Sequence, residues 1–166
     1  MSKRTFILHD ESVNTYGFRM LTSGGNLEEF RKNPVMLLNH DDWKMPIGRW
    51  ENIRIEGTQI LADAVFDEAD PRAVEVQQKV DTDFLRMASI GAWAQETSDA
   101  YDLMLPGQTS PTVTKWTARE ASIDRCKPQR LGTVRQQGQP CQYGQFFKAR
   151  QHPHGNYGVY RITGHF

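Results

Sequence analysis

Hydrophobic and polar residues alternate along several short stretches of this chain, a pattern typical of strands with one buried face. The clearest case is a pair of stretches, Ile47 to Ile55 and Gln59 to Phe66, which are separated by Glu56-Gly57. Apolar side chains recur at every second position of the later stretch, at Ile60, Ala62, Ala64 and Phe66. We therefore expect a β-hairpin that turns near Glu56-Gly57.

Other segments also have the composition of strands. Val35 to Leu38 is a continuous apolar run of strand length, which indicates a strand buried on both faces. The remaining predicted strands are Phe6–Leu8, Arg86–Ala94, Thr112–Trp116 and Glu120–Ile123. Turn-forming residues dominate Gly24-Gly25 and the stretch from Tyr101 to Pro111, so we expect loops there.

Two segments carry helix signals. Asp70-Pro71 offers an N-cap residue followed by proline at the first helical position. Apolar residues then follow at helical spacing, at Ala73, Val76, Val80 and Phe84, which predicts a main helix over about residues 71–84. A short helix is expected over about residues 27–32, because Asn26 and Glu29 form a capping-box pattern and Asn33-Pro34 ends the helix.

The predicted fold class is α+β, a β-rich small barrel of mainly antiparallel strands with these two helices. A chain of 166 residues has the length of one domain. Its 20 basic and 20 acidic residues balance, but no acidic residue follows Asp124. We assign residues 1–124 to one domain, and we predict that the basic, Gln- and Gly-rich tail 125–166 is disordered or out of frame.

Composition excludes several classes of protein. The two cysteines, Cys126 and Cys141, do not make a disulfide framework and fit no common zinc spacing, so we expect a reducing compartment. The apolar stretch near the N-terminus is too short for the core of a signal peptide. No apolar run reaches the length of a membrane span, so we expect no membrane partner.

Three residues offer the parts of an activated nucleophile. His40 follows the apolar strand 35–38, Ser89 lies in the predicted strand 86–94, and Glu120 begins another predicted strand. In such a site the histidine takes the proton of the serine hydroxyl, and the acid orients and charge-balances the histidine. Asp41, Asp42 and Asp124 are rival acids. Taken singly, each residue also fits an ordinary structural role.

The other histidines do not predict a metal site. His152 and His154 have a spacing that can hold a metal, but no acid or thiol lies at a matching spacing, and His9 and His165 stand alone. Aromatic residues alternate with Lys148, Arg150 and Arg161 in the tail, a pattern that suits stacking on nucleic-acid bases. Nucleic-acid binding through the tail is therefore an alternative function.

Taken together, the motifs resemble the prohead proteases of tailed bacteriophages over roughly residues 5–124. The matching segments are Asn33-Pro34-Val35, Asn39-His40-Asp41, Pro46-Ile47-Gly48-Arg49, Phe66-Asp67, Ser89-Ile90-Gly91 and Glu120-Ala121-Ser122-Ile123. The resemblance implies a barrel like that of the herpesvirus assembly protease. It also implies a serine endopeptidase with His40 as general base, Ser89 as nucleophile and Glu120 as the acid.

The same resemblance implies partners and a location. The substrates would be the scaffold segment of the major capsid protein precursor and the protease itself, with self-association or self-cleavage and no cofactor. The protein would act in the bacterial host cytoplasm, inside the assembling prohead, and nucleic acid would not be a partner. A catalytically inactive capsid-assembly protein is a second alternative.

Two positions depart from the family pattern. Ala92 stands where the family has an aromatic residue, and Ile123-Asp124 runs into Arg125-Cys126-Lys127-Pro128 instead of a stretch like Ala-Asn-Pro. If residues 125–130 are written with the chosen codons CGC TGC AAA CCC CAA CGC, reading one base later gives Ala-Ala-Asn-Pro-Asn-Ala. We therefore hypothesise a frameshift near Asp124, and a divergent native tail is the alternative.

Overall fold

The computed structural model of the chain describes residues 4–125 and 160–161. Its strands are β1 (Arg4–His9), β2 (Gly25–Asn26), β3 (Val35–Leu38), β4 (Gly48–Glu56), β5 (Gln59–Phe66), β6 (Met87–Ser98), β7 (Thr112–Asp124) and β8 (Tyr160–Arg161). Two α-helices, α1 (Glu28–Lys32) and α2 (Pro71–Asp81), and two short 3-10 turns, Thr22–Gly24 and Tyr101–Leu103, complete the described elements.

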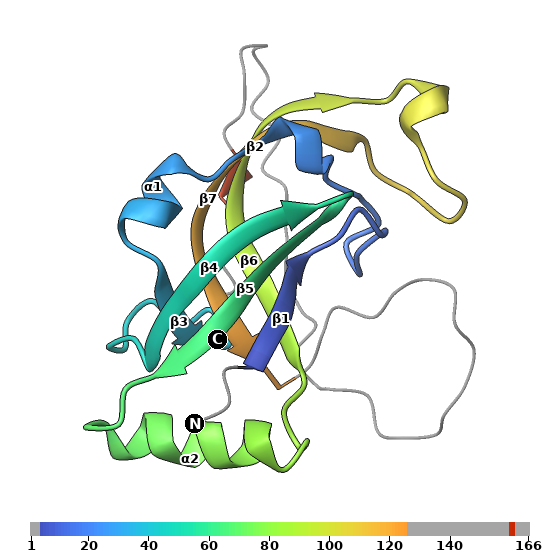
Figure 1. Cartoon of the computed structure of the whole chain (residues 1–166). Helices are drawn as coiled ribbons and strands as arrows, with labels where there is room; N and C mark the ends of the chain where they lie inside the picture. The colour runs from blue at the N-terminus through green and yellow to red at the C-terminus, as the bar shows by residue number, and fades with distance from the viewer. Residues whose placement is uncertain (1–3, 126–159, 162–166) are drawn as a thin grey trace.

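All described strands belong to one curled sheet. The order along the sheet is β1-β5-β4-β3-β7-β6-β8, and β2 pairs with β7 beside this path. Most pairs are antiparallel, while β3 and β2 run parallel to β7. The sheet curls until β1 contacts β6 near its other end, and α2 lies across one open end (Figure 1). The structure thus confirms the predicted α+β class, a small β-rich half-barrel with two helices.

The main helix starts where the sequence predicts. The Asp70 side chain accepts a hydrogen bond from the backbone N–H of Arg72 at 2.9 Å, and Pro71 occupies the first helical position. Ala73, Val76 and Val80 are buried. The helix ends at Asp81, however, so the predicted extension to residue 84 is wrong. Phe84 lies beyond it and is 78% exposed. Phe84 lies four residues after Val80, as on one face of a helix, but the two residues do not belong to the same helix.

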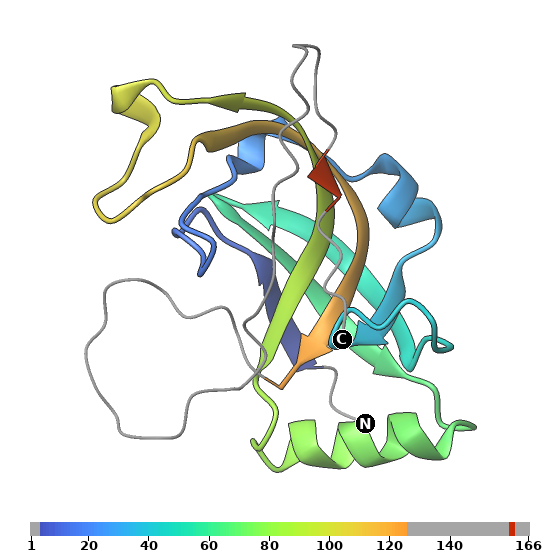
Figure 2. The ribbon, with the colours of Figure 1, turned by 180° about the vertical axis from the view of Figure 1, so that it is seen from behind.

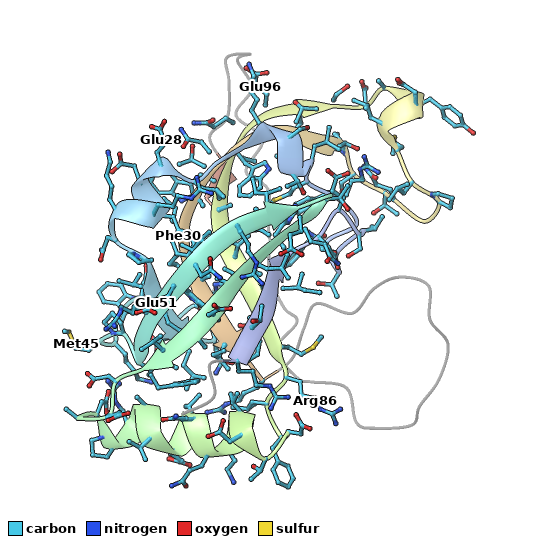
Figure 3. All side chains as sticks on the ribbon, viewed as in Figure 1. Glu28, Phe30, Met45, Glu51, Arg86 and Glu96 are labelled. Atoms are coloured by element: carbon cyan, nitrogen blue, oxygen red, sulfur yellow. The ribbon has the colours of Figure 1, made fainter. Side chains whose placement is uncertain are left out.

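The short helix α1 also forms, but without the predicted capping box. Its N-cap position is Leu27, and the Asn26 side chain accepts instead from the backbone N–H of Glu28 at 2.9 Å. Phe30 points into the core and is 1% exposed, while Glu28 points outward (Figure 3). The predicted loop at Gly24-Gly25 contains the start of β2, because the chain here passes very close to β7. A Cβ on Gly24 would lie 1.8 Å from the Thr114 carbonyl oxygen.

The predicted hairpin is β4 and β5, and it turns at residues 57–58 as expected. Its alternation is interrupted by a bulge between Glu51 and Arg54, where Asn52 has φ 51°. Beyond the bulge Ile55 is 49% exposed. The two predicted strands 112–116 and 120–123 form one continuous strand, β7, which pairs along its length with β6 and makes a long curved ribbon (Figure 2).

A buried tryptophan connects the two halves of the sheet. Trp50 on β4 is 1% exposed, and its indole N–H donates to the carbonyl oxygen of Ala121 on β7 at 2.9 Å. Phe6 packs edge-on against the Trp50 ring. Buried polar groups with good partners fix one packing arrangement, so this bond holds the central segment of β7 in place against the core.

Among the residues that the structure describes, no helix combines the length and apolarity that a membrane span requires. Of the predicted tail, residues 160–161 pair with β6 at Trp93 and Ala94. Residues 126–159 and 162–166 lie outside the described part of the chain, so the domain boundary at residue 124 and the state of the tail remain predictions.

Candidate functional site

The register of β6 against β7 gathers polar groups on one face of the sheet. The paired residues are Met87 with Asp124, Ser89 with Ser122, and Gly91 with Glu120. Side chains that are two residues apart on a strand share a face, so all six positions point the same way. The intervening residues Ala121 and Ile123 are fully buried in the core on the opposite face.

His40 reaches this face from a tight turn after β3. Asn39 and His40 have φ 55° and 56°, a left-handed conformation that is uncommon outside glycine. Hydrogen bonds to β7 hold the turn: the Asn39 backbone N–H donates to the Ile123 carbonyl at 3.0 Å, and the His40 backbone N–H donates to Ser122 Oγ at 3.0 Å. The Asn39 side chain accepts from the backbone N–H of Arg125 at 2.9 Å.

The three residues singled out from the sequence lie in a hydrogen-bonded chain. Ser89 Oγ is 2.7 Å from His40 Nε2, and His40 Nδ1 is 2.6 Å from Glu120 Oε1. The imidazole therefore lies between a hydroxyl and a carboxylate, one at each ring nitrogen. The His40 side chain retains 32% of its exposure, and that of Glu120 retains 15%. The imidazole is thus partly accessible to solvent, while the acid is largely covered.

Ser122 holds both the base and the acid. Its hydroxyl accepts from the His40 backbone N–H and donates to Glu120 Oε2 at 2.9 Å. The side chain is fully buried, so these two bonds are its replacements for water. Because the same oxygen contacts both residues, it fixes the Glu120 carboxylate relative to the backbone that carries the imidazole.

Gly91 makes room for the acid. A Cβ built on Gly91 would lie 1.8 Å from Glu120 Oε1, the oxygen that contacts His40. The open space beside Gly91 is thus occupied by the carboxylate of its cross-strand partner.

A bulge follows the site. The register shifts between Gly91 and Ala92, and Arg119 is the extra residue on β7. Its guanidinium lies over the Trp93 ring, 3.9 Å from the centroid. Bulges re-aim side chains and commonly end a regular segment of pairing. The regular ladder that carries the site therefore ends at the pair Gly91 and Glu120.

The rival acids have separate positions. Asp41 forms an ion pair with Lys44 at 2.9 Å, and the hydrogen bond from Lys44 keeps the pKa of Asp41 below its usual value. Asp42 is exposed. Asp124 does enter the site, but at the other edge of the ring: its Oδ2 accepts a hydrogen bond from Ser89 Oγ, and its Oδ1 is 3.6 Å from His40 Nε2. Glu120 is the acid at Nδ1.

The surroundings of His40 favour its charged form. Burial of the ring is the largest single influence and lowers the pKa. The hydrogen bond and negative charge of Glu120, together with the charge of Asp124, outweigh it, so the pKa of His40 lies above its usual value. The site is therefore built to stabilise an imidazolium, the species that a general base becomes during proton transfer.

Of the remaining histidines, the structure describes only His9. His9 is 9% exposed and packs against the Trp116 ring at 5.2 Å between centroids. His152, His154 and His165 lie outside the described residues. Within residues 4–125, no group of His, Cys, Asp or Glu side chains has an arrangement that could hold a metal ion.

Ser122, the role of Gly91 and the placement of Asp124 were missed by sequence reasoning. Each depends on the pairing of residues 87–91 with residues 120–124, and register between distant strands leaves no local pattern. The Glu-x-Ser spacing of Glu120 and Ser122 was one usable signal, because residues two apart on a strand share a face.

Chemically, this arrangement can activate a hydroxyl. A neutral imidazole at 2.7 Å can take the Ser89 proton, and the carboxylate of Glu120 can stabilise the resulting charge. Comparisons with protein-family models, with curated proteins and with solved structures found no match to this chain.

Proposed function

We propose that this protein is a serine endopeptidase of the prohead protease type. The observation that carries the proposal is the unbroken chain from Ser89 Oγ through His40 to Glu120, with distances of 2.7 and 2.6 Å. Nucleophile, base and orienting acid come from three separate segments, and ordinary packing does not require their polar atoms to meet in this order. The resemblance of the flanking motifs to prohead proteases supplies the reaction class.

In the proposed reaction, Ser89 Oγ attacks the carbonyl carbon of the scissile peptide bond while its proton moves to His40 Nε2. Glu120 stabilises the imidazolium through Nδ1–H. The imidazolium then protonates the leaving amine, which leaves an acyl group on Ser89. A water molecule, deprotonated by His40, releases the acyl group and restores the serine. The raised pKa of His40 suits the acid half of this cycle.

The proposed substrates follow from the resemblance alone. They are the scaffold segment of a capsid precursor and the chain itself, cleaved in the host cytoplasm inside the assembling prohead. We propose no cofactor for the reaction, because the groups that it needs are present as side chains of His40, Ser89 and Glu120.

The first test is reaction with a fluorophosphonate probe, which labels serines that an adjacent base activates. We expect one labelled site at Ser89, located by mass spectrometry, and no labelling of Ser89→Ala or His40→Ala. Ser98→Ala, on the same strand but outside the site, serves as the matched control and should be labelled normally. If the folded wild-type chain is not labelled at any of the pH values tested, the proposal is contradicted.

The second test uses the expected substrate. The capsid precursor encoded in the same genome should be shortened when co-expressed with the wild-type chain and remain intact with Ser89→Ala. A folded protein that is neither labelled nor active here would instead favour a catalytically inactive assembly role. Tight DNA binding that weakens steeply with salt, without cleavage of the precursor, would favour the nucleic-acid alternative.

A further inference from the structure

Asp124 is a buried carboxylate at the serine end of the site. It is the last residue of β7, and it is 4% exposed. Its pairing partner on β6 is Met87, so it shares a face with Ser89 and Ser122. The carboxylate bridges the two reacting groups: Oδ2 accepts from Ser89 Oγ, and Oδ1 is 3.6 Å from His40 Nε2.

The hydroxyl of Ser89 has one proton and two neighbours that can accept it. A serine hydroxyl donates one hydrogen bond at a time. If it donates to Asp124, it cannot donate to His40 Nε2. Both close contacts are then attractive only when Nε2 itself carries a proton and donates to Ser89 Oγ, or when Asp124 is protonated.

Both contacts are therefore satisfied when one proton is held between His40 Nε2 and the Asp124 carboxylate. A protonated His40 lies between the carboxylates of Glu120 and Asp124, which favours the ion-paired form over a neutral pair. In that form the serine hydroxyl points at Asp124 and the base is occupied. The serine becomes a nucleophile only after the shared proton leaves for solvent and Nε2 can accept.

We propose that Asp124 is a fourth functional residue of this site, a carboxylate that competes with His40 for the Ser89 proton and so sets the pH at which the serine reacts. This inference rests on the proposed function and deepens it. Asp124 would hold the serine unreactive while the shared proton is present. After that proton is lost, Asp124 would help to stabilise the imidazolium that forms during attack.

The charged groups around Asp124 fit this role. The turn after β3 presents the His40 ring, and β7 presents Glu120 on the far side of that ring. From β6, Met87 adds no charge. Arg86 lies at the entry to β6 (Figure 3), where its side chain donates to the Asp83 carbonyl at 2.9 Å. Arg125 follows the end of β7 and is exposed.

A purely structural role makes a different prediction. In such a role, Asp124 matters only because it ends β7 and accepts a hydrogen bond from a neighbouring hydroxyl. In that case its replacement would lower stability and leave the pH dependence of His40 and Ser89 unchanged. The two roles are therefore separated by a pH profile rather than by a loss of activity.

The experiment compares Asp124→Asn with Asp42→Asn, which removes a charge from an exposed position two residues after His40. The rate of fluorophosphonate labelling of Ser89 is measured from acid to alkaline pH. We expect the midpoint of the Asp124→Asn profile to fall by about one pH unit or more, since a charge within hydrogen-bonding range shifts a pKa by that order. Below the wild-type midpoint this variant should label about tenfold faster. Asp42→Asn should follow the wild type.

A second measurement does not depend on catalysis. In the Ser89→Ala chain, the His40 imidazole is titrated by NMR with and without Asp124→Asn. The titration midpoint should fall with the asparagine, and Asp124→Ser should shift it in the same direction if the asparagine variant does not fold. An unchanged midpoint in both measurements overturns the role of Asp124. A shifted ring titration without any labelling of Ser89 supports the coupling and overturns the proposed enzyme.

Discussion

Gly91 and Glu120 face each other across β6 and β7, and the carboxylate of Glu120 occupies the space that a side chain on Gly91 would fill. The oxygen in that space is the one that contacts His40 Nδ1 at 2.6 Å. The position of the acid thus depends on an absent side chain on the neighbouring strand, as well as on the hydrogen bonds that the carboxylate makes.

Gly91→Ala should displace Glu120 and lower activity. The added methyl would lie 1.8 Å from Glu120 Oε1, so the carboxylate must rotate away from the imidazole. We expect a loss of at least tenfold in kcat/KM, measured on the capsid precursor. The far-UV circular dichroism spectrum should stay like that of the wild type, which shows that the fold is kept. In a Glu120→Gln background the same change should add little, because its effect acts through Glu120. Full additivity would contradict this explanation.

Ser122→Ala should weaken both the fold and the site. It removes the hydroxyl that contacts both the His40 backbone and Glu120, and leaves their polar groups without that partner. We expect a loss of about 1–3 kcal/mol in the free energy of unfolding, measured by urea denaturation. Fluorophosphonate labelling of Ser89 should also slow. Ser98→Ala is the control, and equal effects of the two changes would argue against a bridging role for Ser122.

Ser89→Ala and His40→Ala should each reduce cleavage to background, and the double variant should be no worse than either. The two residues act as one unit, so removal of one partner leaves the other without a function. Background-corrected rates of precursor cleavage, measured by gel densitometry, provide the comparison. A further large loss in the double variant would indicate two independent contributions.

Glu120→Gln should reduce kcat/KM less than either of those changes, because an orienting acid is partly replaceable. Glu120→Gln should also move the acid limb of the profile of kcat/KM against pH. The raised pKa of His40 keeps the base protonated above about pH 6.5, the ordinary histidine value, so the wild-type limb lies above that pH. Loss of the Glu120 charge lowers this pKa, and the limb should shift toward acid. A limb that stays in place would mean that Glu120 does not act on His40.

The same pKa affects stability. Because the folded-state pKa of His40 lies above its unfolded value, its contribution to the free energy of unfolding is fully present below about pH 6.5 and is lost as pH rises through the folded pKa. The difference in unfolding free energy between wild type and His40→Gln should therefore shrink from pH 6 to pH 9. Chemical denaturation across that range, with Asp42→Asn as control, measures the trend. A constant or growing difference would contradict it.

Local signals predicted most of the fold. Asp70-Pro71 gave the start of α2, and the alternation of residues 59–66 gave β5, because capping and strand periodicity are properties of short segments. The errors lie where distant segments meet. Phe84 has helical spacing but follows the end of α2, and Gly24-Gly25 resembles a loop because its approach to Thr114 cannot be read locally.

The three main residues of the candidate site were predictable from the sequence, but the hydrogen bonds that surround them were not. His40, Ser89 and Glu120 were singled out by residue type and by the resemblance of their flanking motifs, and the described structure brings them together. The contacts of Ser122 and Asp124 required the register of β6 against β7 and the left-handed turn at Asn39 and His40. A register that joins residues 87–91 to residues 120–124 is not encoded in a stretch of sequence short enough to recognise.

The ladder between residues 87–91 and 120–124 has a consequence for insertions and deletions. Ser89, Gly91, Glu120, Ser122 and Asp124 all depend on one continuous register, and a one-residue shift of either strand turns that strand's members to the opposite face. A residue gained or lost within either segment would dismantle the whole cluster at once. The connection 99–111 lies beyond the bulge that ends this ladder, so we expect a change in its length to leave the register of the cluster in place. We thus expect length changes in the connection 99–111 to be tolerated, and length changes within the ladder of residues 87–91 and 120–124 to destroy the site.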